Sequence, residues 1–123
     1  MTHTATHRMS EEMEQCIQNC LDCYRVCLQT VTYCLKMGGK HAAAEHILLL
    51  LDCAEICQTS ASFMLRNSDL HGQACAVCAE VCERCAESCE QFGEDIQMKA
   101  CAEACRRCAA SCNQMARAQG KAA

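Results

Sequence analysis

Apolar and sulfur-containing side chains return along most of this chain at alternating steps of three and four positions. Glu, Gln, Arg, Asn and Asp fill the positions between them. This spacing places one apolar stripe on each α-helix and leaves the rest of its surface polar. The pattern is interrupted at residues 38–39, 67–69 and 93–95. It therefore predicts four helices, at about residues 10–36, 41–66, 70–91 and 95–118.

The expected fold class is all-α. The connections between the predicted helices are short, so neighbouring helices should run antiparallel in an up-down-up-down four-helix bundle. A length of 123 residues suits one domain. We expect the bundle to occupy residues 10–118, with an N-terminal tail at 1–9 and a C-terminal tail at 119–123.

The predicted inner stripe consists mainly of cysteine. The chain has 16 cysteines among 123 residues, and all of them fall on the three-and-four register. They are Cys16, Cys20, Cys23, Cys27, Cys34, Cys53, Cys57, Cys75, Cys78, Cys82, Cys85, Cys89, Cys101, Cys105, Cys108 and Cys112. One or two buried cysteines would act as small apolar residues, but packing does not explain cysteine in nearly every layer of a core. We interpret the stripe as a metal-binding core with these residues as its candidate ligands.

Composition and motifs exclude several classes of protein. A net charge of −4 with only two Phe and two Tyr gives neither the basic surface nor the stacking platform of a nucleic-acid-binding protein. The longest apolar run, residues 47–51, is far shorter than the ~20 residues of a membrane span. The first residues contain no hydrophobic core of a secretory signal, so we expect a cytoplasmic protein with reduced thiols. There is no Ser-His-Asp order and no Gly-rich phosphate loop, so no enzymatic activity is expected.

Sulfur chemistry separates the candidate metals. Iron–sulfur clusters gather four cysteines around one compact centre, whereas these cysteines extend along whole helices. Four thiolates around Zn²⁺ leave a charge of −2 at each buried site, and no basic residue on the stripe neutralises it. Each Cu(I) neutralises one thiolate, so charge balance favours multiple Cu(I) ions, about one per cysteine. The alternatives are a zinc or cadmium thiolate buffer with one metal per four cysteines, a thiol redox protein, and cross-bundle disulfides; bridges within one helix have poor geometry.

Two runs carry a family resemblance, Cys16-xxx-Cys20-xx-Cys23-xxx-Cys27 and Cys101-xxx-Cys105-xx-Cys108-xxx-Cys112. On the basis of these runs, the chain resembles the cytosolic branch of the bacterial copper storage protein family, and the resemblance covers essentially its whole length. The resemblance implies a four-helix bundle that holds many Cu(I) ions on thiolates in its lumen, assembles into a homotetramer and stores copper without catalysis. The second predicted helix departs from the pattern at Leu50 and Ser60, so its copper capacity should be lower.

Other soft donors fall near the two ends of the predicted bundle. Up-and-down folding brings Met37, His41, His46, Phe92 and Met98 to one end, and Met9, Met13, Met64, His71 and Met115 to the other. In the family that the chain resembles, a mouth with His and Met admits copper. We therefore expect entry at His41, His46, Met37 and Met98, with a copper chaperone as a candidate donor.

A second apolar stripe lies beside the cysteines of the first predicted helix. It comprises Ile17, Leu21, Tyr24, Leu28, Val31 and Leu35, and the second helix adds Ile47, Leu48 and Leu51. These residues either pack against neighbouring helices or form a subunit interface, and we favour a homo-oligomer.

Overall fold

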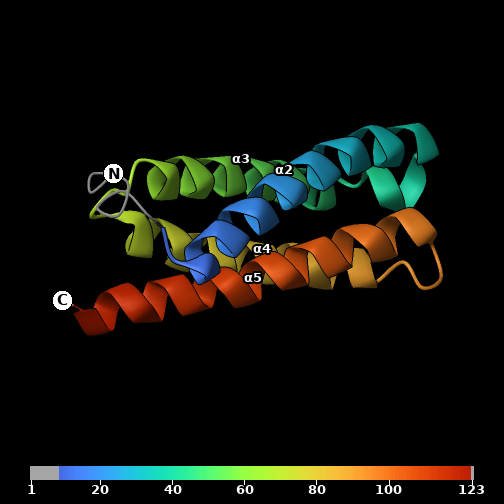
Figure 1. Cartoon of the computed structure of the whole chain (residues 1–123). Coiled ribbons are helices and arrows are strands. Elements are labelled where there is room, and N and C mark those ends of the chain that lie inside the picture. Colours follow the sequence, from blue (N-terminus) through green and yellow to red (C-terminus); the bar gives the residue numbers. More distant parts are fainter. Residues whose placement is uncertain (1–8, 123) are drawn as a thin grey trace.

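The computed structural model describes residues 9–122, and every regular element in that part of the chain is a helix. The elements are α2 (Glu11–Met37), the short 3-10 helix η1 (Gly39–Ala42), α3 (Ala44–Leu65), α4 (His71–Glu90) and α5 (Ile96–Ala122), as Figure 1 shows. The predicted all-α class is confirmed.

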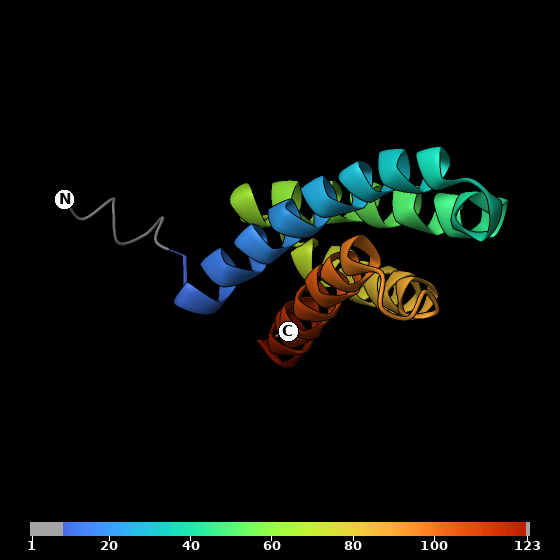
Figure 2. The ribbon, with the colours of Figure 1, turned by 90° about the vertical axis from the view of Figure 1, so that its right-hand side faces the viewer.

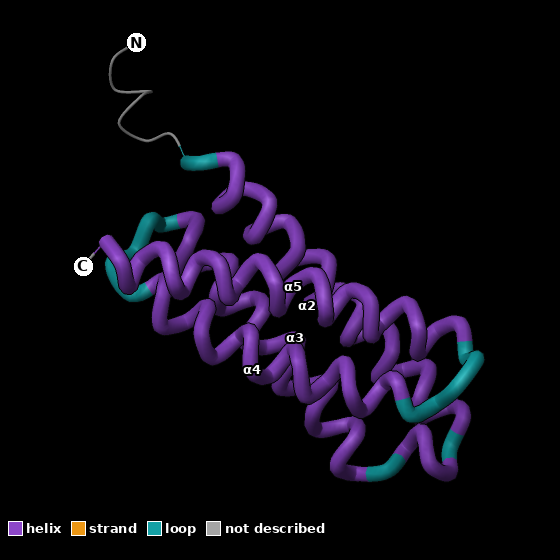
Figure 3. The backbone as a smooth tube through the Cα atoms, turned by 90° about the horizontal axis from the view of Figure 1, so that it is seen from below, coloured by secondary structure: helices purple, strands orange, loops and turns teal. Residues whose placement is uncertain are grey.

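The four long helices form an antiparallel bundle. Each one packs beside two others: α2 and α4 both contact α3 and α5. Figure 2 shows α2 lying beside α3 and α4 lying beside α5. The loops gather at the two ends of the rod (Figure 3). Residues 38–43 and 91–95 connect helices at one end, here called the paired-loop end, and residues 66–70 connect α3 to α4 at the single-loop end.

Both ends of α2 carry strong local signals. The side chain of Ser10 caps the helix by accepting a hydrogen bond from the backbone N–H of Met13 at 3.1 Å, and the first turn holds three glutamates that suit the positive end of the helix dipole. At the other end, Gly38 adopts φ +70°, and its N–H donates to the Cys34 carbonyl. Glycine fits this position because residues with a Cβ rarely adopt positive φ.

The C-terminus of α3 is closed by a hydrogen-bonded turn around Asn67. This residue has φ 53°, a left-handed conformation that asparagine tolerates better than most residues. Its N–H donates to Met64 O at 2.9 Å, and the N–H of Ser68 donates to Phe63 O at 2.9 Å. The two bonds make a Schellman turn, which reverses the chain into α4.

The helices differ from the predicted ranges at two places. Residues 39–42 form a separate 3-10 turn, so α3 begins at Ala44 and not near residue 41. Residues 119–122, expected in a C-terminal tail, continue α5. The helix continues through Gly120, and Gln119 is anchored because its side-chain oxygen accepts a hydrogen bond from the N–H of Gly72.

By length and composition, α3 meets the criterion for a membrane span, with a mean hydropathy of 1.4 over its best 18-residue window. This is weak evidence, because core helices of soluble proteins meet the same criterion. One face of α3 supplies Cys53, Cys57 and Met64 to the buried interior, and α2 and α4 pack against the helix.

Candidate metal centre

All 16 cysteines lie in the interior as free thiols, each at most 1% exposed. They are not joined by disulfides, because their nearest sulfur–sulfur contacts are 3.6 Å, far beyond the ~2.05 Å of an S–S bond. The predicted register therefore placed every cysteine correctly on the inner face of its helix. The cross-bundle disulfides kept as an alternative do not occur here.

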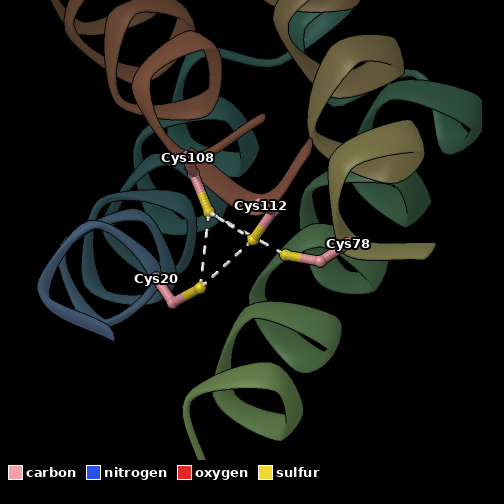
Figure 4. A group of neighbouring side chains, drawn as sticks. All are labelled: Cys20, Cys78, Cys108 and Cys112. Atoms are coloured by element: carbon pink, nitrogen blue, oxygen red, sulfur yellow. Dashed lines mark hydrogen bonds between the residues drawn. The ribbon is translucent and has the colours of Figure 1, made fainter. Parts of the chain in front are cut away.

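One group of four sulfurs shows how the helices cooperate. Cys20 from α2, Cys78 from α4, and Cys108 and Cys112 from α5 point toward a common centre (Figure 4). Cys108 Sγ lies 3.6 Å from Cys20, 3.8 Å from Cys78 and 4.0 Å from Cys112. Because Cys108 and Cys112 are one helical turn apart, a single helix contributes two corners of the group.

Such groups continue along the bundle and share their members. Four further sets have all their sulfurs within 4.8 Å of one another: Cys57, Cys78, Cys82 and Cys108; Cys23, Cys53, Cys57 and Cys82; Cys23, Cys27, Cys53 and Cys105; and Cys27, Cys85, Cys101 and Cys105. Cys23 and Cys105, for example, each belong to two sets. The sulfurs therefore form one continuous array and not a row of separate sites.

The sulfur spacing suits thiolate-bound metal ions. With a metal–sulfur bond of about 2.3 Å, as for zinc, sulfurs around one ion lie about 3.8 Å apart in a tetrahedron and about 4.0 Å apart in a triangle. The observed contacts of 3.6–4.0 Å match both geometries. The spacing therefore leaves room for thiolate-bound ions without selecting the metal.

The interior contains no fixed positive charge to balance thiolates. Among the described residues, the buried polar side chains are Thr30, His46 and Ser60, and no Lys or Arg is among them. In the described part of the chain, no buried Lys or Arg is therefore available to balance the negative charge of ionised thiols. The ion itself must supply the charge that neutralises the sulfurs.

The pKa values of the thiols follow from burial and sulfur–sulfur hydrogen bonding. Burial, with smaller contributions from the nearby Cys101 and Asp95, raises the pKa of Cys34 to about 11. In the middle of the array, hydrogen bonds with Cys101 and Cys23 raise the pKa of Cys105. Hydrogen bonding from Cys105 lowers that of Cys23. A thiolate that forms at one position is therefore stabilised by protonated neighbours.

Three positions on the stripe hold no sulfur. Leu50 is fully buried on α3, as the sequence predicts. The hydroxyl of Ser60 is turned to the backbone, donating to Ala74 O at 3.1 Å. Thr30 occupies the α2 position between Cys27 and Cys34, donates to Val26 O at 2.7 Å and accepts from Gln97 Nε2 at 3.0 Å. The hydroxyl groups of Ser60 and Thr30 therefore have hydrogen-bond partners within the protein and need no metal ion.

Mixed donors meet at the paired-loop end. Cys34 Sγ lies 3.4 Å from His46 Nε2 and donates to Met98 Sδ at 3.6 Å. Cys34 and Met98 are fully buried, and His46 is 5% exposed. Of the other two predicted entry residues, Met37 is 53% exposed at the end of α2, and His41 Nε2 lies 3.0 Å from Asp95 Oδ2. The structure therefore joins His46 and Met98 to the array and leaves Met37 and His41 outside it.

The single-loop end is closed by methionine. Met64 is fully buried, and its Sδ accepts a hydrogen bond from Cys75 Sγ at 3.8 Å. Met115 is 7% exposed, and Met13 packs against the core. His71 turns its Nδ1 to the carbonyl of Ser68 at 2.9 Å. This imidazole nitrogen is bound to the backbone and to Gln119, away from the thiols.

Sequence reasoning missed two residues that organise the paired-loop end. Ser88 Oγ lies 2.7 Å from His46 Nδ1, and Asp95 accepts a hydrogen bond from the Tyr33 hydroxyl at 2.7 Å. Ser88 sits next to Cys89 in sequence and carries no pattern of its own. Asp95 lies in the predicted interruption at residues 93–95, and it caps α5 by accepting a hydrogen bond from Met98 N–H at 3.1 Å.

Comparison with known proteins gives consistent results. A family model described as "Copper storage protein" matches residues 9–117. A protein of Nitrosospira multiformis is 45% identical, with a TM-score of 0.84 over 89% of this chain and 99% of its own. The Cu(I)-bound copper storage protein BsCsp3 is 35% identical, with a TM-score of 0.80 over 86% of this chain and 99% of its own.

A third relative is the copper storage protein Ccsp of Streptomyces lividans. Two of its structures, one loaded with 10 copper equivalents and one with five coppers, are each 28% identical to this chain. Both have a TM-score of 0.81 over 87% of this chain. The match covers 85% of the structure with 10 copper equivalents and 93% of the structure with five coppers. The second is described as a cytosolic copper storage protein.

Proposed function

Because this chain belongs to the copper storage protein family, we propose that its 16 cysteines are the ligands and that they hold Cu(I) at about one ion per cysteine. The observation that carries this proposal is the continuous array of buried, shared sulfurs in a core that lacks fixed positive charge. Eight of the cysteines belong to two of the groups named above, so each of these can bridge two ions.

Charge balance sets the expected capacity. One Cu(I) replaces one thiol proton, so a core with equal numbers of copper ions and cysteines stays neutral, apart from the histidine and methionine donors. Fewer ions with fully ionised thiols would leave buried negative charge, which is strongly unfavourable in a low-dielectric interior. Partial loading is stable only if the unused sulfurs remain protonated, and the raised pKa of Cys34 fits that requirement.

Zinc or cadmium storage is the competing use of the same sulfurs. A tetrahedral ion needs four thiolates of its own, and 16 cysteines then provide at most about four such sites. Eight cysteines occur in two of the five named groups, so those five groups cannot all be occupied by independent tetrahedral ions. This sharing favours a bridged Cu(I) array.

The paired-loop end is the proposed entrance. His46 and Met98 contact Cys34, which gives incoming copper a path from neutral donors to a thiolate. Imidazole and thioether hold Cu(I) more weakly than thiolate does, so the ion can be captured and then passed inward. His41 and Met37 lie at the same end and complete the proposed entry region.

We also infer a cytoplasmic homo-oligomer, with a tetramer as the specific proposal, to which a copper chaperone delivers the metal. Reduced thiols are needed for loading, and the cytosol maintains them. The second apolar stripe supports association: Leu21 and Leu28 of α2 are each 38% exposed, and Leu35 is 56% exposed. On the adjacent α3, Leu48 and Leu51 are 59% and 40% exposed. Neighbouring helices within one chain therefore leave these leucines partly uncovered, whereas Ile17 is buried and Tyr24, Val31 and Ile47 pack against the core.

The test of this proposal is an anaerobic titration of the fully reduced protein with Cu(I), in the presence of a strong competing Cu(I) chelator. We expect about 16 coppers per chain to remain bound. A parallel titration with Zn²⁺ should saturate near four ions. Saturation with one or two coppers, or equal capacities for copper and zinc, would contradict the proposal.

A further inference from the structure

A pocket on the side of the bundle reaches one donor of the paired-loop end. It has a volume of about 330 Å³ and lies between α3 and α4. His46, Leu49, Ser88 and Phe92 are among its lining residues, and Lys40 stands at its edge. Its lining residues come from α3, α4 and the loops that adjoin them, and none is in α2 or α5, so the pocket lies on the α3–α4 side of the rod.

His46 connects this pocket to the thiols. The ring lines the pocket, its Nε2 lies 3.4 Å from Cys34 Sγ, and its Nδ1 lies 2.7 Å from Ser88 Oγ. The side chain is nearly buried, with 5% exposure, so the serine holds the imidazole in one orientation. One residue thus touches both the outer pocket and the first cysteine of the array.

The axial approach at the same end is filled by other side chains. The Phe92 ring lies 4.3 Å from the His41 ring and 5.0 Å from the His46 ring. Asp95 joins the Tyr33 hydroxyl at 2.7 Å and His41 at 3.0 Å, which fixes α2, η1 and the start of α5 together. These contacts give the end of the bundle a packed cover.

We propose that Cu(I) enters the array from the side, through this pocket, with His46 as its first protein ligand and Ser88 as the residue that positions the imidazole. This rests on the proposed storage function. With Nδ1–H donating to Ser88 Oγ, Nε2 directs its lone pair toward the core. Copper moves from Nε2 to Cys34 Sγ: the Cu–N bond breaks, a Cu–S bond forms, and the thiol proton leaves to solvent.

The size of the pocket indicates what delivers the ion. A volume of about 330 Å³ is at the lower end of the range for small-ligand pockets, ~300–1,000 Å³. The pocket therefore admits Cu(I) with a small exchangeable ligand, and the copper chaperone proposed above would release the ion outside it. Lys40 at the edge donates to Gln91 O at 3.3 Å and lies over the Phe92 ring.

Blocking the pocket tests the route. The chain has no Trp, so Leu49→Trp fills the pocket and introduces a single reporter. Ile96→Trp is the matched control, because Ile96 lies at the same end of the bundle, is 84% exposed and does not line the pocket. Cu(I) is supplied anaerobically as its acetonitrile complex, and thiolate-to-copper absorption is followed by stopped flow.

We expect Leu49→Trp to slow loading at least tenfold with its final capacity unchanged, and Ile96→Trp to load at the parental rate. Loading of Leu49→Trp at the parental rate would overturn the side entrance. The number of coppers that the parental protein finally binds tests the storage proposal, whereas the loading rate of Leu49→Trp tests the side entrance. A low final number in the parental protein would contradict storage.

The positioning role of Ser88 is tested by rescue. Ser88→Ala should slow loading severalfold, and Ser88→Thr should restore it, because threonine keeps the hydroxyl that holds His46 Nδ1. Capacity and helical circular dichroism should be unchanged in both variants. If Ser88→Ala loads at the parental rate, or if Ser88→Thr is as slow as Ser88→Ala, then Ser88 does not position the imidazole.

Discussion

His46 Nε2 and Cys34 Sγ lie 3.4 Å apart, joining a histidine at the start of α3 to the last cysteine of α2. The Cys34 sulfur also contacts the thioether of Met98, whereas the central cysteines contact several thiols each. The array thus begins with a thiol surrounded by neutral donors. Its interior consists of thiols that share their neighbours.

This difference predicts unequal effects of single cysteine substitutions. Cys105 contacts Cys23 at 3.7 Å and Cys53 at 3.9 Å and belongs to two four-sulfur groups. Cys105→Ala should therefore lower the capacity by two or more coppers, and Cys34→Ala by about one. Copper per chain is counted by elemental analysis after gel filtration. Equal losses in the two variants would contradict a bridged array.

Loading should release protons at neutral pH. The pKa of Cys34 is raised to about 11 by burial, so this thiol is protonated throughout the range from pH 6 to pH 8. Copper must displace the proton, and affinity at a site of this kind should fall about tenfold for each unit of decreasing pH. Titration in weak buffer with a pH indicator should record about one proton per copper. Absence of proton release would mean that the empty core already holds thiolates.

Asp95 should contribute to the stability of the empty protein. It caps α5 through Met98 N–H at 3.1 Å and accepts a hydrogen bond from Tyr33 at 2.7 Å. Asp95→Ala should lower the free energy of unfolding by about 1–2 kcal/mol, and Asp95→Asn by less, because asparagine can also cap a helix. Urea denaturation of the reduced, metal-free variants measures both effects.

The pH dependence of this contribution has a definite sign. The hydrogen bond from Tyr33 holds the pKa of Asp95 below its ordinary value. The stabilisation is therefore complete above the unfolded pKa of ~3.9 and is lost as pH falls through the lower folded value. The difference in unfolding free energy between the parental protein and Asp95→Asn should shrink as pH falls below about pH 4. A difference that grew over this acidic range would be inconsistent with this assignment.

The exposed leucines of α2 predict a self-association surface. Leu28 and Leu35 are 38% and 56% exposed and lie about two helical turns apart. Replacing both with Glu should dissociate the proposed oligomer, because two charges would be buried at the interface. Ile96→Glu, at a residue 84% exposed on α5, is the control that should keep the parental mass. Analytical ultracentrifugation distinguishes the forms, and a parental chain that sediments as a monomer would refute the interface.

The inner stripe was predictable because helical periodicity is a property of the sequence alone. A step of three or four residues keeps every side chain on one face, so the burial of all 16 cysteines followed from their spacing. The same register extended to Leu50, Ser60 and Met64 on α3. Thr30 was also within reach, because it lies three positions after Cys27 and four before Cys34.

Pairings between helices were not predictable from periodicity. Ser88 and His46 are 42 residues apart, and Tyr33 and Asp95 are 62 residues apart, so their contacts depend on the rotation and axial offset of whole helices. The end of α5 was also misjudged, because the Gln119 side chain accepts from the N–H of Gly72 in another helix. Local sequence signals determine where each helix forms, and packing between helices determines which residues of their faces come into contact.

The most direct test of a core neutralised by singly charged ions counts copper and protons together. Native mass spectrometry of the reduced, loaded protein gives the number of coppers per chain and, from the exact mass, the number of protons each one displaced. The account predicts about 16 coppers, with about one proton lost for each. Saturation at about four metal ions, or copper uptake without loss of protons, would contradict it.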